Sequence, residues 1–457
     1  MASLTSVNPA TGEVVARTED HSEVEVERRV ARAAEVFRVW RRRPVSERTR
    51  LSGRAAEVLL AGKERFARLM TQEMGKIYRA ALAEVEKCAW ACRYYAEYGE
   101  RFLADEEVRT DAPRSYRRFL PLGPVLAVMP WNFPFWQVFR FAAPGLVAGN
   151  VGLLKHASTV SLCALAIEEV FRQAGFPDGV FQTLLVGSSR VERLVEDPRV
   201  AAVTLTGSEG AGMAVAAAAG RALKKTVLEL GGSDAFVVMP SADLDLAVKT
   251  AVAARIVNSG QSCIAAKRFI VHREVYEGFV AGMVAAMRAL RVGDPMDPDT
   301  EVGPLASSAE LDRLTGQVEA LVQDGARVLT GGVPLGGPGA YYPPTVLVDV
   351  PRRSPTYRQE LFGPVALVIE VADLDEAIAA ANEVPFGLGS SAFTRDPAER
   401  ARLVDELEAG ATSVNAMVVS DPRLPFGGVK RSGYGRELSR EGIREFVNVK
   451  AVVIRGE

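Results

Sequence analysis

Between residues 125 and 239 the chain alternates short, almost wholly apolar runs with segments of helical periodicity. Strands that are buried on both faces read in this way, because they carry little polar alternation. Strands that alternate with helices in sequence form parallel, doubly wound sheets. The pattern therefore predicts an α/β fold, with strands expected at 125–129, 151–154, 181–185, 200–205 and 235–239.

Helical segments precede this region, and a second α/β series follows it. The spacing of apolar residues predicts helices at 22–40, 47–70 and 78–103, with Ser22 as the N-cap of the first. The sequence Ser241-Ala-Asp-Leu-Asp opens a further helix that reaches about residue 257. Strands are then expected at 268–272, 345–350, 365–371, 388–394 and 411–415, and helices at 274–290, 308–324, 374–382 and 396–408.

These two series predict two α/β domains with a boundary near 230–240. We expect the functional site in the crevice between them, where ligand sites of such proteins concentrate. The Pro-Leu-Gly-Pro break at 121–124 suggests that 108–125 is a hairpin standing off the main body. The strand-like run around Ile454 in the tail could pair with it.

The composition argues against several classes of function. The 55 Lys and Arg residues against 57 Asp and Glu imply no basic surface for nucleic acid. Three histidines speak against a His-rich metal site, and four scattered cysteines are too few for a disulfide framework. Neither a signal-peptide pattern nor a run of about 20 apolar residues is present. We therefore expect a cytoplasmic protein without a membrane span.

Cys263 is the candidate nucleophile, because it lies in the polar, glycine-containing loop Asn258-Ser-Gly-Gln-Ser-Cys. A thiol reacts as its thiolate, so neighbouring charges or helix dipoles must lower its pKa. The alternative is a small buried side chain without a chemical role. That alternative is favoured for Cys88, Cys92 and Cys163, which lie in expected helices.

Two further features lie at strand ends. Glu229 ends an apolar strand and precedes two glycines, where a buried carboxyl group can act as a general base. Gly207 and Ser208 lie between a strand and an Ala-rich helix, where backbone can approach a pyrophosphate. The alternative for Glu229 is a glutamate that faces solvent, and the alternative for Gly207 and Ser208 is an ordinary turn. The spacing of the glycines is not the Gly-x-Gly-x-x-Gly fingerprint.

Asn132 and Lys155 follow two other expected strands. Asn132 lies in Pro130-Trp-Asn-Phe-Pro, where flanking prolines fix a loop that can hold an amide donor towards an oxyanion. Lys155 could contact ribose or phosphate oxygens. A packed aromatic turn and a solvated lysine are the respective alternatives.

Taken together, seven motifs resemble those of the aldehyde dehydrogenase superfamily, in the same order and over nearly the whole chain. Within it, the chain is most similar to bacterial NAD(P)-dependent succinate-semialdehyde dehydrogenases. The motifs are Pro130-Trp-Asn-Phe-Pro, Leu154-Lys-His-Ala, Thr206-Gly-Ser, Glu229-Leu-Gly-Gly, Gly260-Gln-Ser-Cys, Glu360-Leu-Phe-Gly-Pro-Val and Pro425-Phe-Gly-Gly-Val-Lys-Arg-Ser-Gly-Tyr-Gly-Arg-Glu.

The resemblance implies a division of the chain. Residues 1–107 and 126–231 would form a Rossmann-like cofactor-binding domain, and residues 232–425 a catalytic domain with the cysteine nucleophile. Residues 108–125 and 435–457 would form a small β element that joins subunits into a homodimer or homotetramer.

The resemblance also implies a role for each matching residue. Cys263 would attack an aldehyde carbon, Asn132 would hold the oxyanion, and Glu229 would activate the water that hydrolyses the thioester. Glu437 matches a glutamate of the proton relay. Cofactor contacts are implied for Trp131, Lys155, His156, Ser158, Gly207, Ser208, Leu230, Glu360 and Phe362.

The choice of cofactor depends on the residue three places after Lys155. NAD-preferring relatives carry a glutamate there, which would repel the 2′-phosphate of NADP. Here the residue is Ser158, and Lys155 and His156 are also available. We therefore expect that either NAD or NADP is used.

The choice of substrate depends on residues that match the carboxylate-binding residues of relatives. Arg140 and Ser420 match residues that bind the distal carboxylate in succinate-semialdehyde dehydrogenases. The alternative for Arg140 is an ordinary ion pair. Val257 and Phe141 replace cations found in some relatives, so Arg423 is the candidate for a second cation.

The leading hypothesis is NAD(P)-dependent oxidation of succinic semialdehyde to succinate without a metal. The alternatives are a broad-specificity or glutarate-semialdehyde dehydrogenase, acylation of coenzyme A, and a catalytically silent, thiol-sensing protein. No cysteine lies beside Cys263 to protect it in a disulfide. An exposed thiolate there is expected to oxidise easily.

Overall fold

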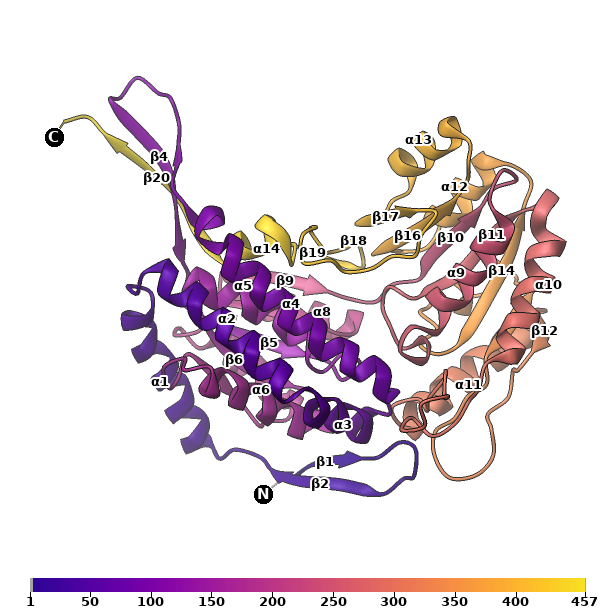
Figure 1. Ribbon diagram of the computed structural model, residues 1–457, viewed down its shortest axis with the longest axis horizontal. Helices are drawn as coiled ribbons and strands as arrows, with labels where there is room; N and C mark the ends of the chain where they lie inside the picture. The colour runs from indigo at the N-terminus through magenta and orange to yellow at the C-terminus, as the bar shows by residue number, and fades with distance from the viewer. Residues whose placement is uncertain (1–2, 457) are drawn as a thin grey trace.

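The computed structural model describes residues 3–456, and the predicted α/β fold is confirmed. Two sheets of mainly parallel strands, each flanked by helices, form two lobes that lie side by side (Figure 1). Within residues 3–456, no helix is long and apolar enough to cross a membrane.

The sheet of the first lobe has the strand order β19-β9-β8-β5-β6-β7. Five of its strands run parallel, and the short β19 pairs antiparallel with β9. Their bounds are β5 Pro124–Met129, β6 Val151–His156, β7 Phe181–Thr183, β8 Ala202–Thr206, β9 Lys225–Glu229 and β19 Gly433–Tyr434. Because the carboxyl ends of parallel strands share one edge, residues after β5, β6, β8 and β9 converge there.

Helices cover both faces of this sheet. They are α1 Glu23–Trp40, α2 Val45–Ala61, α3 Lys63–Met74, α4 Tyr78–Leu103, α5 Trp136–Ala148, α6 Ser161–Gln173, α7 Val191–Glu196 and α8 Glu209–Arg221, with 3₁₀ turns at Ser158–Val160 and Ser188–Arg190. The single helix expected at 47–70 is wrong. The chain leaves the helix at Gly62, which has a φ of −99° and a ψ of 10° and separates α2 from α3.

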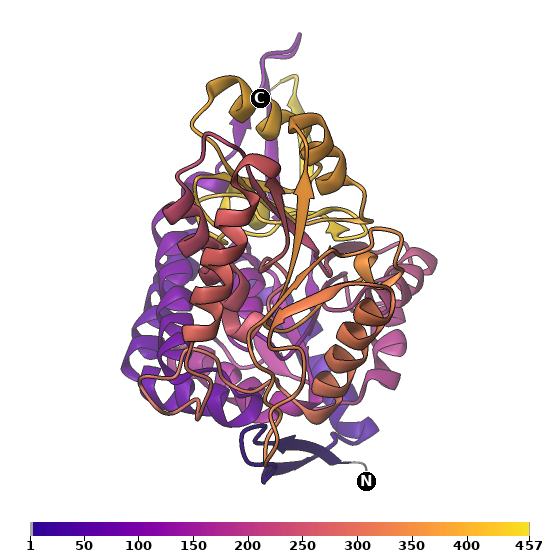
Figure 2. The ribbon, with the colours of Figure 1, turned by 90° about the vertical axis from the view of Figure 1, so that its right-hand side faces the viewer.

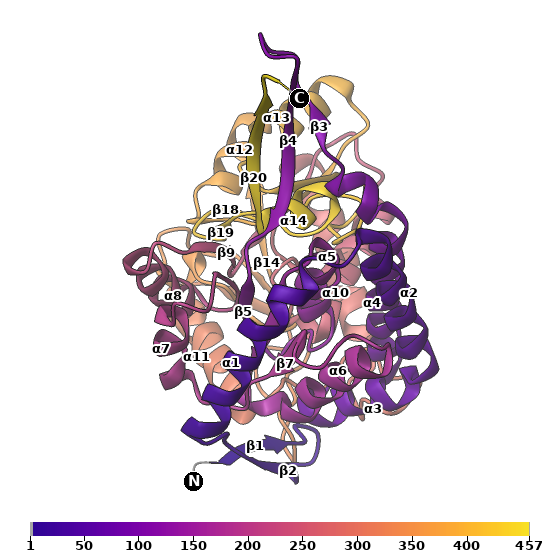
Figure 3. The same ribbon diagram turned by 90° about the vertical axis from the view of Figure 1, so that its left-hand side faces the viewer.

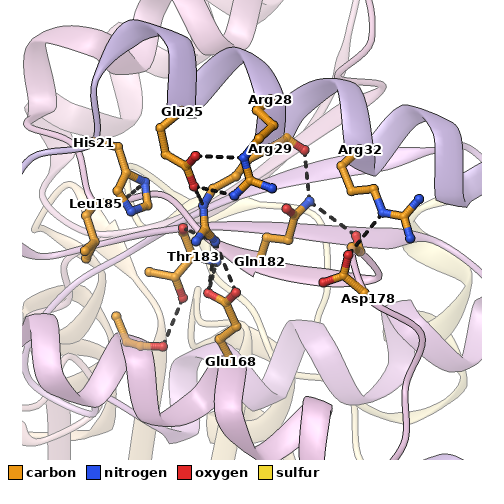
Figure 4. Close-up of polar contacts among 12 residues, drawn as sticks. His21, Glu25, Arg28, Arg29, Arg32, Glu168, Asp178, Gln182, Thr183 and Leu185 are labelled. Carbon is orange, nitrogen blue, oxygen red and sulfur yellow. Dashed lines mark hydrogen bonds and ion pairs between the residues drawn. The ribbon is translucent and has the colours of Figure 1, made fainter.

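Helix α1 is attached to the edge strand β7 by polar contacts (Figure 4). Ser22 caps the helix as expected, accepting a hydrogen bond from the backbone N–H of Glu25. Arg29 lies 2.7 Å from Glu25 and 3.1 Å from Glu168, and it also donates to the carbonyl of Thr183. The helix thereby ties down an edge that would otherwise be open to another strand.

The sheet of the second lobe has the order β12-β13-β14-β11-β10-β16-β17 and faces the viewer in Figure 2. Only β12 pairs antiparallel. The strands are β10 Asp234–Val238, β11 Ala266–His272, β12 Arg327–Thr330, β13 Thr345–Val348, β14 Val365–Val371, β16 Gly389–Phe393 and β17 Ala411–Val414. The helices are α9 Leu244–Ile256, α10 Arg273–Ala289, α11 Ser308–Gln323, α12 Leu374–Asn382 and α13 Pro397–Glu406, with 3₁₀ turns at Val257–Gly260 and Thr356–Arg358.

A three-stranded sheet projects from the first lobe, with β20 and β4 side by side in Figure 3. It contains β3 Glu106–Glu107, β4 Arg114–Pro121 and β20 Val447–Ile454. All eight residues of β20 pair antiparallel with β4, as expected for the tail and the 108–125 segment. The remaining elements are β1 Ser3–Val7, β2 Val14–Glu19, β15 Phe386–Gly387, β18 Val429–Lys430 and α14 Ser439–Glu445.

Candidate active site

Cys263 lies where two cavities meet. One, here called the α4 cavity, is lined by α4, α5 and the segments 257–264 and 417–426. The other, here called the interlobe crevice, is lined by the ends of β5, β8 and β9 and by residues from the second lobe between 310 and 362. Cys263 and Gln137 line both. A thiol in this position can contact a different molecule on each side.

The loop that carries Cys263 makes a strained turn after α9. Asn258 and Ser259 have φ values of 53° and 55°, and Gly260 has a φ of 79°. A Cβ at Gly260 would lie 2.2 Å from the carbonyl carbon of Gly363, so only glycine fits there. This contact brings the segment after Glu360 against the cysteine loop.

A buried lysine holds the same loop from the other side. Lys267 Nζ donates to the carbonyls of Ser262 at 2.7 Å and Cys263 at 2.6 Å. It also lies 3.3 Å from Glu360 Oε1. Because a buried ammonium must be satisfied by acceptors, Lys267 ties the loop to Glu360.

The Cys263 thiol is half-buried rather than exposed. Burial raises its pKa to about 12, although the cations Arg140 and Lys267 oppose the shift. At neutral pH the group is therefore a thiol. The expected thiolate is therefore disfavoured in the structure without a ligand, because partial burial penalises the charged form of the sulfur.

The Asn132 side chain is fixed at both ends of its amide. Its Nδ2 donates to the carbonyl of Gln261 at 3.0 Å, and its Oδ1 accepts from Gln137 Nε2 at 3.0 Å. One N–H of the amide is left to donate elsewhere. Because Asn132 and Cys263 both line the interlobe crevice, that N–H is preorganised near the thiol.

Glu229, Arg140 and Glu437 form a buried charged cluster. Arg140 Nε lies 2.7 Å from Glu437 Oε2, and Nη2 donates to Thr206 Oγ1 at 3.3 Å. Glu229 is 2% exposed, and neither carboxyl oxygen has a hydrogen-bond partner among the described residues. Burial and the charge of Glu437 raise the pKa of Glu229 well above its usual value. Burial therefore favours the uncharged form of Glu229, which lies beside the Arg140–Glu437 ion pair.

The interlobe crevice gathers most of the residues predicted to bind a cofactor. Trp131, Gly207, Ser208, Leu230, Glu360 and Phe362 all line it. Ser208 caps α8, so the N-terminus of that helix opens beside the crevice. A Cβ at Gly231 would lie 2.6 Å from Glu360 Oε2, which shows why glycine follows Leu230. The helix terminus and the closely approaching backbone fit a dinucleotide.

Lys155 lies in a neighbouring, largely apolar cavity between β5, β8 and α8. Sequence reasoning missed Ser188 and Ser189, which line the same cavity. Their position shortly after β7, at the edge where the parallel strands end, is the signal that could have revealed them. The cavity has the character of an adenosine site, with a cation and hydroxyl groups at an apolar slot.

His156 does not line this cavity, so the structure lends no support to the predicted cofactor contact. Its Nε2 lies 2.9 Å from the carbonyl of Pro134, and its Nδ1 accepts from the backbone N–H of Ala157. Burial lowers its pKa to about 4, so the ring is neutral and positions the loop before α5. Ser158 begins a 3₁₀ turn and lines neither this cavity nor the crevice.

The α4 cavity contains Arg140 and Ser420, as predicted for a substrate site. Arg423 does not line it, so the structure lends no support to Arg423 as the second cation of the site. Its guanidinium is 2.6 Å from Asp421 and packs over the ring of Trp90 on the exposed side of α4. Besides Arg140, the cation that lines the cavity is Lys87, which no motif marks.

No cluster of three or more His, Cys, Asp or Glu side chains that could hold a metal occurs between residues 3 and 456. The four cysteines are free, and Cys88, Cys92 and Cys163 are buried in helices.

Comparisons with known proteins agree with this geometry. A model of the aldehyde dehydrogenase family matches residues 2–452. A probable NADP⁺ succinate-semialdehyde dehydrogenase of Synechocystis is 55% identical over 99% of both chains. A succinate-semialdehyde dehydrogenase of Mycobacterium tuberculosis is also 55% identical over 99% of both chains.

Solved structures are similar over the same length. Succinic semialdehyde dehydrogenase from Streptococcus pyogenes, in complex with NADP⁺, is 35% identical with a TM-score of 0.97, over 99% of this chain and all of that one. Lactaldehyde dehydrogenase from Escherichia coli also has a TM-score of 0.97, at 33% identity over all of this chain and 96% of that one. The fold alone therefore does not decide the substrate.

The raised pKa of Cys263 predicts how its alkylation depends on pH. Below the pKa, the thiolate fraction rises about tenfold per pH unit, so the rate of labelling by iodoacetamide should rise from pH 7 to pH 9 without a plateau. Mass spectrometry of the native protein should show labelling at Cys263 alone. Cys263→Ala is the control and should remain unlabelled. A plateau below pH 8 would contradict the burial argument.

The raised pKa of Glu229 predicts a stability effect. The folded state keeps a proton that the unfolded state loses above about pH 4.5, so stability falls as pH rises towards the folded pKa, by up to about 1.4 kcal/mol per pH unit. Glu229→Gln removes this loss. Its Tm should exceed that of the wild type by more at pH 8 than at pH 5.5.

The matched control for this change is Glu100→Gln, on the exposed face of α4. Its carboxylate lies in solvent, so its Tm difference from the wild type should not change with pH. A Glu229→Gln difference that is equally flat would show that the carboxyl is not held in its protonated form.

Proposed function

This chain belongs to the aldehyde dehydrogenase family, whose members are NAD(P)-dependent oxidoreductases, and we propose that it oxidises succinic semialdehyde to succinate. One observation carries the proposal: Cys263 separates a crevice suited to a dinucleotide from a cavity that contains cations and a serine hydroxyl. An aldehyde carbon at the sulfur would place a short chain and its distal carboxylate in the α4 cavity. The relatives named for this substrate support the assignment.

We propose that Cys263 acts as the nucleophile after its proton passes to a water molecule in the adjoining cavity. Its sulfur would form a bond to the aldehyde carbon, and the carbonyl π electrons would move to oxygen. The free N–H of Asn132 would donate to this oxyanion, and loss of one such donor costs about 10²- to 10³-fold in kcat. NADP or NAD in the crevice would supply a hydride acceptor, which leaves a thioester on Cys263.

Glu229 is the proposed base for hydrolysis of the thioester. It would accept a proton from water as the water oxygen attacks the thioester carbon, and the sulfur would leave as the thiolate. Because Glu229 is protonated in its buried position, it must first release that proton. We propose Glu437 as the next carrier, since its charge already acts on Glu229 and Arg140 holds it in place.

We propose that both dinucleotides are used, with NADP accepted because no acidic side chain stands at position 158. Lys155 and the hydroxyls of Ser188 and Ser189 line the cavity that suits the adenosine half. The 2′-phosphate would therefore meet a cation and hydroxyl donors instead of a carboxylate. The NADP⁺ named with the relatives supports this proposal.

The test is formation of reduced cofactor with succinic semialdehyde, glutaric semialdehyde and butanal, each with NAD and NADP. We expect kcat/KM for succinic semialdehyde to exceed that for butanal by at least about 100-fold, because a site built for a polar group rejects an analogue that lacks it. Cys263→Ala should abolish turnover of all three. Equal rates with butanal would favour a broad-specificity enzyme, and acyl-coenzyme A in the presence of coenzyme A would show transfer instead of hydrolysis.

We further propose that the protein is a cytoplasmic homodimer or homotetramer joined through β20. This strand is the edge of the projecting sheet and exposes Val449 and Val453 at 53% and 57%. Apolar edge strands pair readily with another chain. Free cysteines support a reducing compartment.

Light scattering should give a mass of two or four times 49.2 kDa for the wild type. The double variant V449D/V453D should give a smaller assembly, because charges on the strand oppose its pairing. Exposed Val24 on α1 provides the control variant V24D, which should keep the wild-type mass. A wild-type mass of one chain would refute the proposal.

A further inference from the structure

Gln137 lies between the two cavities that meet at Cys263, and it lines both of them. The residue belongs to the first turn of α5 and is 2% exposed. Its side-chain Nε2 donates to Asn132 Oδ1 at 3.0 Å. Gln137 is thus in direct contact with the amide that would hold the oxyanion.

The Asn132 amide is the middle of a chain of hydrogen-bonded groups. Its Nδ2 donates to the backbone carbonyl of Gln261 at 3.0 Å, and its Oδ1 accepts from Gln137. Because a carbonyl only accepts, Gln261 decides which end of the Asn132 amide is the nitrogen. The oxygen end then needs a donor, which Gln137 supplies. The terminal torsion of an asparagine has only broad minima, so these two contacts set its angle.

The Gln261 end of the chain belongs to the loop of the nucleophile, two residues before Cys263. The Gln261 carbonyl also accepts from Asn258 Nδ2 at 3.1 Å, and the Gln261 side chain accepts the backbone N–H of Ala306 at 2.8 Å. This carbonyl is therefore fixed from several sides. Asn132 is held between it and a side chain of α5.

The Gln137 end of the chain belongs to a helix whose start is also fixed. Glu84 Oε1 accepts the backbone N–H groups of Phe135 and Trp136, both at 2.9 Å. Glu84 itself forms a buried ion pair with Lys76. The first N–H groups of a helix have no partner within it, so this carboxylate holds the helix start that carries Gln137.

The other end of the Gln137 amide is not satisfied. Its Oε1 is buried and has no hydrogen-bond partner among the described residues. A buried polar atom without a partner costs free energy, which an apolar side chain of similar length would avoid. The contact of Nε2 with Asn132 therefore explains why an amide occupies this position.

This contact affects the strength of the Asn132 donor as well as its direction. Hydrogen bonds in a chain polarise one another, so a donor at the oxygen of an amide makes its N–H groups stronger donors. Asn132 has one N–H left to donate near the thiol. Attack of the sulfur on the aldehyde and attack of water on the thioester would both place negative charge on the same oxygen. A polarised N–H would stabilise both steps.

We propose that Gln137 is a positioning residue, which orients and polarises the Asn132 amide for the oxyanion through its Nε2 hydrogen. This inference rests on the proposed function, because it concerns the oxyanion formed when Cys263 adds to an aldehyde. It does not depend on which aldehyde is oxidised, since every aldehyde forms that oxyanion.

The test compares Gln137→Met with the wild type on succinic semialdehyde and butanal. Methionine has a similar length and no donor. We expect kcat to fall about tenfold for both aldehydes, which is less than the loss of about 10²- to 10³-fold for removal of an oxyanion donor itself. KM should change less than about threefold, because the oxyanion forms only after the aldehyde has bound.

Asn132→Ala shows whether Gln137 acts through Asn132. When Gln137→Met is added to Asn132→Ala, kcat should fall further by less than about twofold, because no amide is left to position. A further loss of about tenfold in that background would overturn the inference, since it would show that the two residues act independently.

Alkylation of Cys263 by iodoacetamide separates this role from a structural one, because alkylation forms no oxyanion. Its rate in Gln137→Met should stay within about twofold of the wild-type rate. A loss of alkylation that parallels the loss of turnover would overturn the inference, because it would show that the substitution disturbs the thiol itself. Gln137→Leu repeats the comparison should the Met variant not fold.

The matched control is Gln182→Met. Gln182 is also a buried glutamine of the first lobe, and its Nε2 donates to the carbonyl of Arg29 at 2.9 Å (Figure 4). Loss of this hydrogen bond should lower the Tm and change kcat by less than about twofold, because the residue lies away from the site. It shows what loss of a buried glutamine does by itself.

The outcomes distinguish the inference from the proposed function. A wild type that oxidises no aldehyde refutes the proposed function, and the inference with it. A wild type that oxidises butanal as well as succinic semialdehyde refutes the proposed substrate alone, and butanal then serves as the substrate for the same comparison. A Gln137→Met variant of an active enzyme that keeps the wild-type kcat overturns the inference alone.

Discussion

The buried Lys267 ammonium holds the site together, because it joins the two segments that form the interlobe crevice. It donates to the carbonyls of Ser262 and Cys263 and lies beside Glu360. The cysteine loop has an unfavourable backbone turn that does not persist without support from its surroundings. Contacts from Lys267 on one side and Gly363 on the other provide that support. The position of the thiol between two cavities depends on both.

Burial sets the protonation state of the site as well as its shape. The same closure that fixes the loop raises the pKa of Cys263 and of Glu229. Cations placed nearby, Arg140 above all, act in the opposite direction for both groups. Burial therefore favours the uncharged forms of both Cys263 and Glu229, and the charge of Arg140 makes their ionisation less unfavourable. Perturbed ionisable groups of this kind concentrate where a protein performs chemistry.

Much of the fold could be predicted because it depends on local periodicity. Helix α4 has the bounds expected from the spacing of its apolar residues, and Ser22 caps α1. The prediction at 47–70 was wrong because the helical spacing of apolar residues continues across Gly62, where the backbone leaves the helix with a φ of −99° and a ψ of 10°. Similarly, His156 and Arg423 have the right residue type for their predicted roles. The His156 ring instead contacts the Pro134 carbonyl, and the Arg423 guanidinium contacts Asp421. A linear sequence pattern does not reveal these contacts.

The sequence by itself determined the α/β fold, the candidate nucleophile Cys263 and the candidate residues at the strand ends, because strand alternation and short motifs act over a few neighbouring positions. Tertiary structure alone decided which charges face the α4 cavity and which are already neutralised. Lys87 and Ser420 are 333 residues apart, and they meet only because α4 packs against the segment before β18. Whether a lysine is a free cation depends on the carboxylates that surround it in space. Glu84 and Asp421 are close to Lys87 in the fold, and their pairing with Lys76 and Arg423 leaves its charge available.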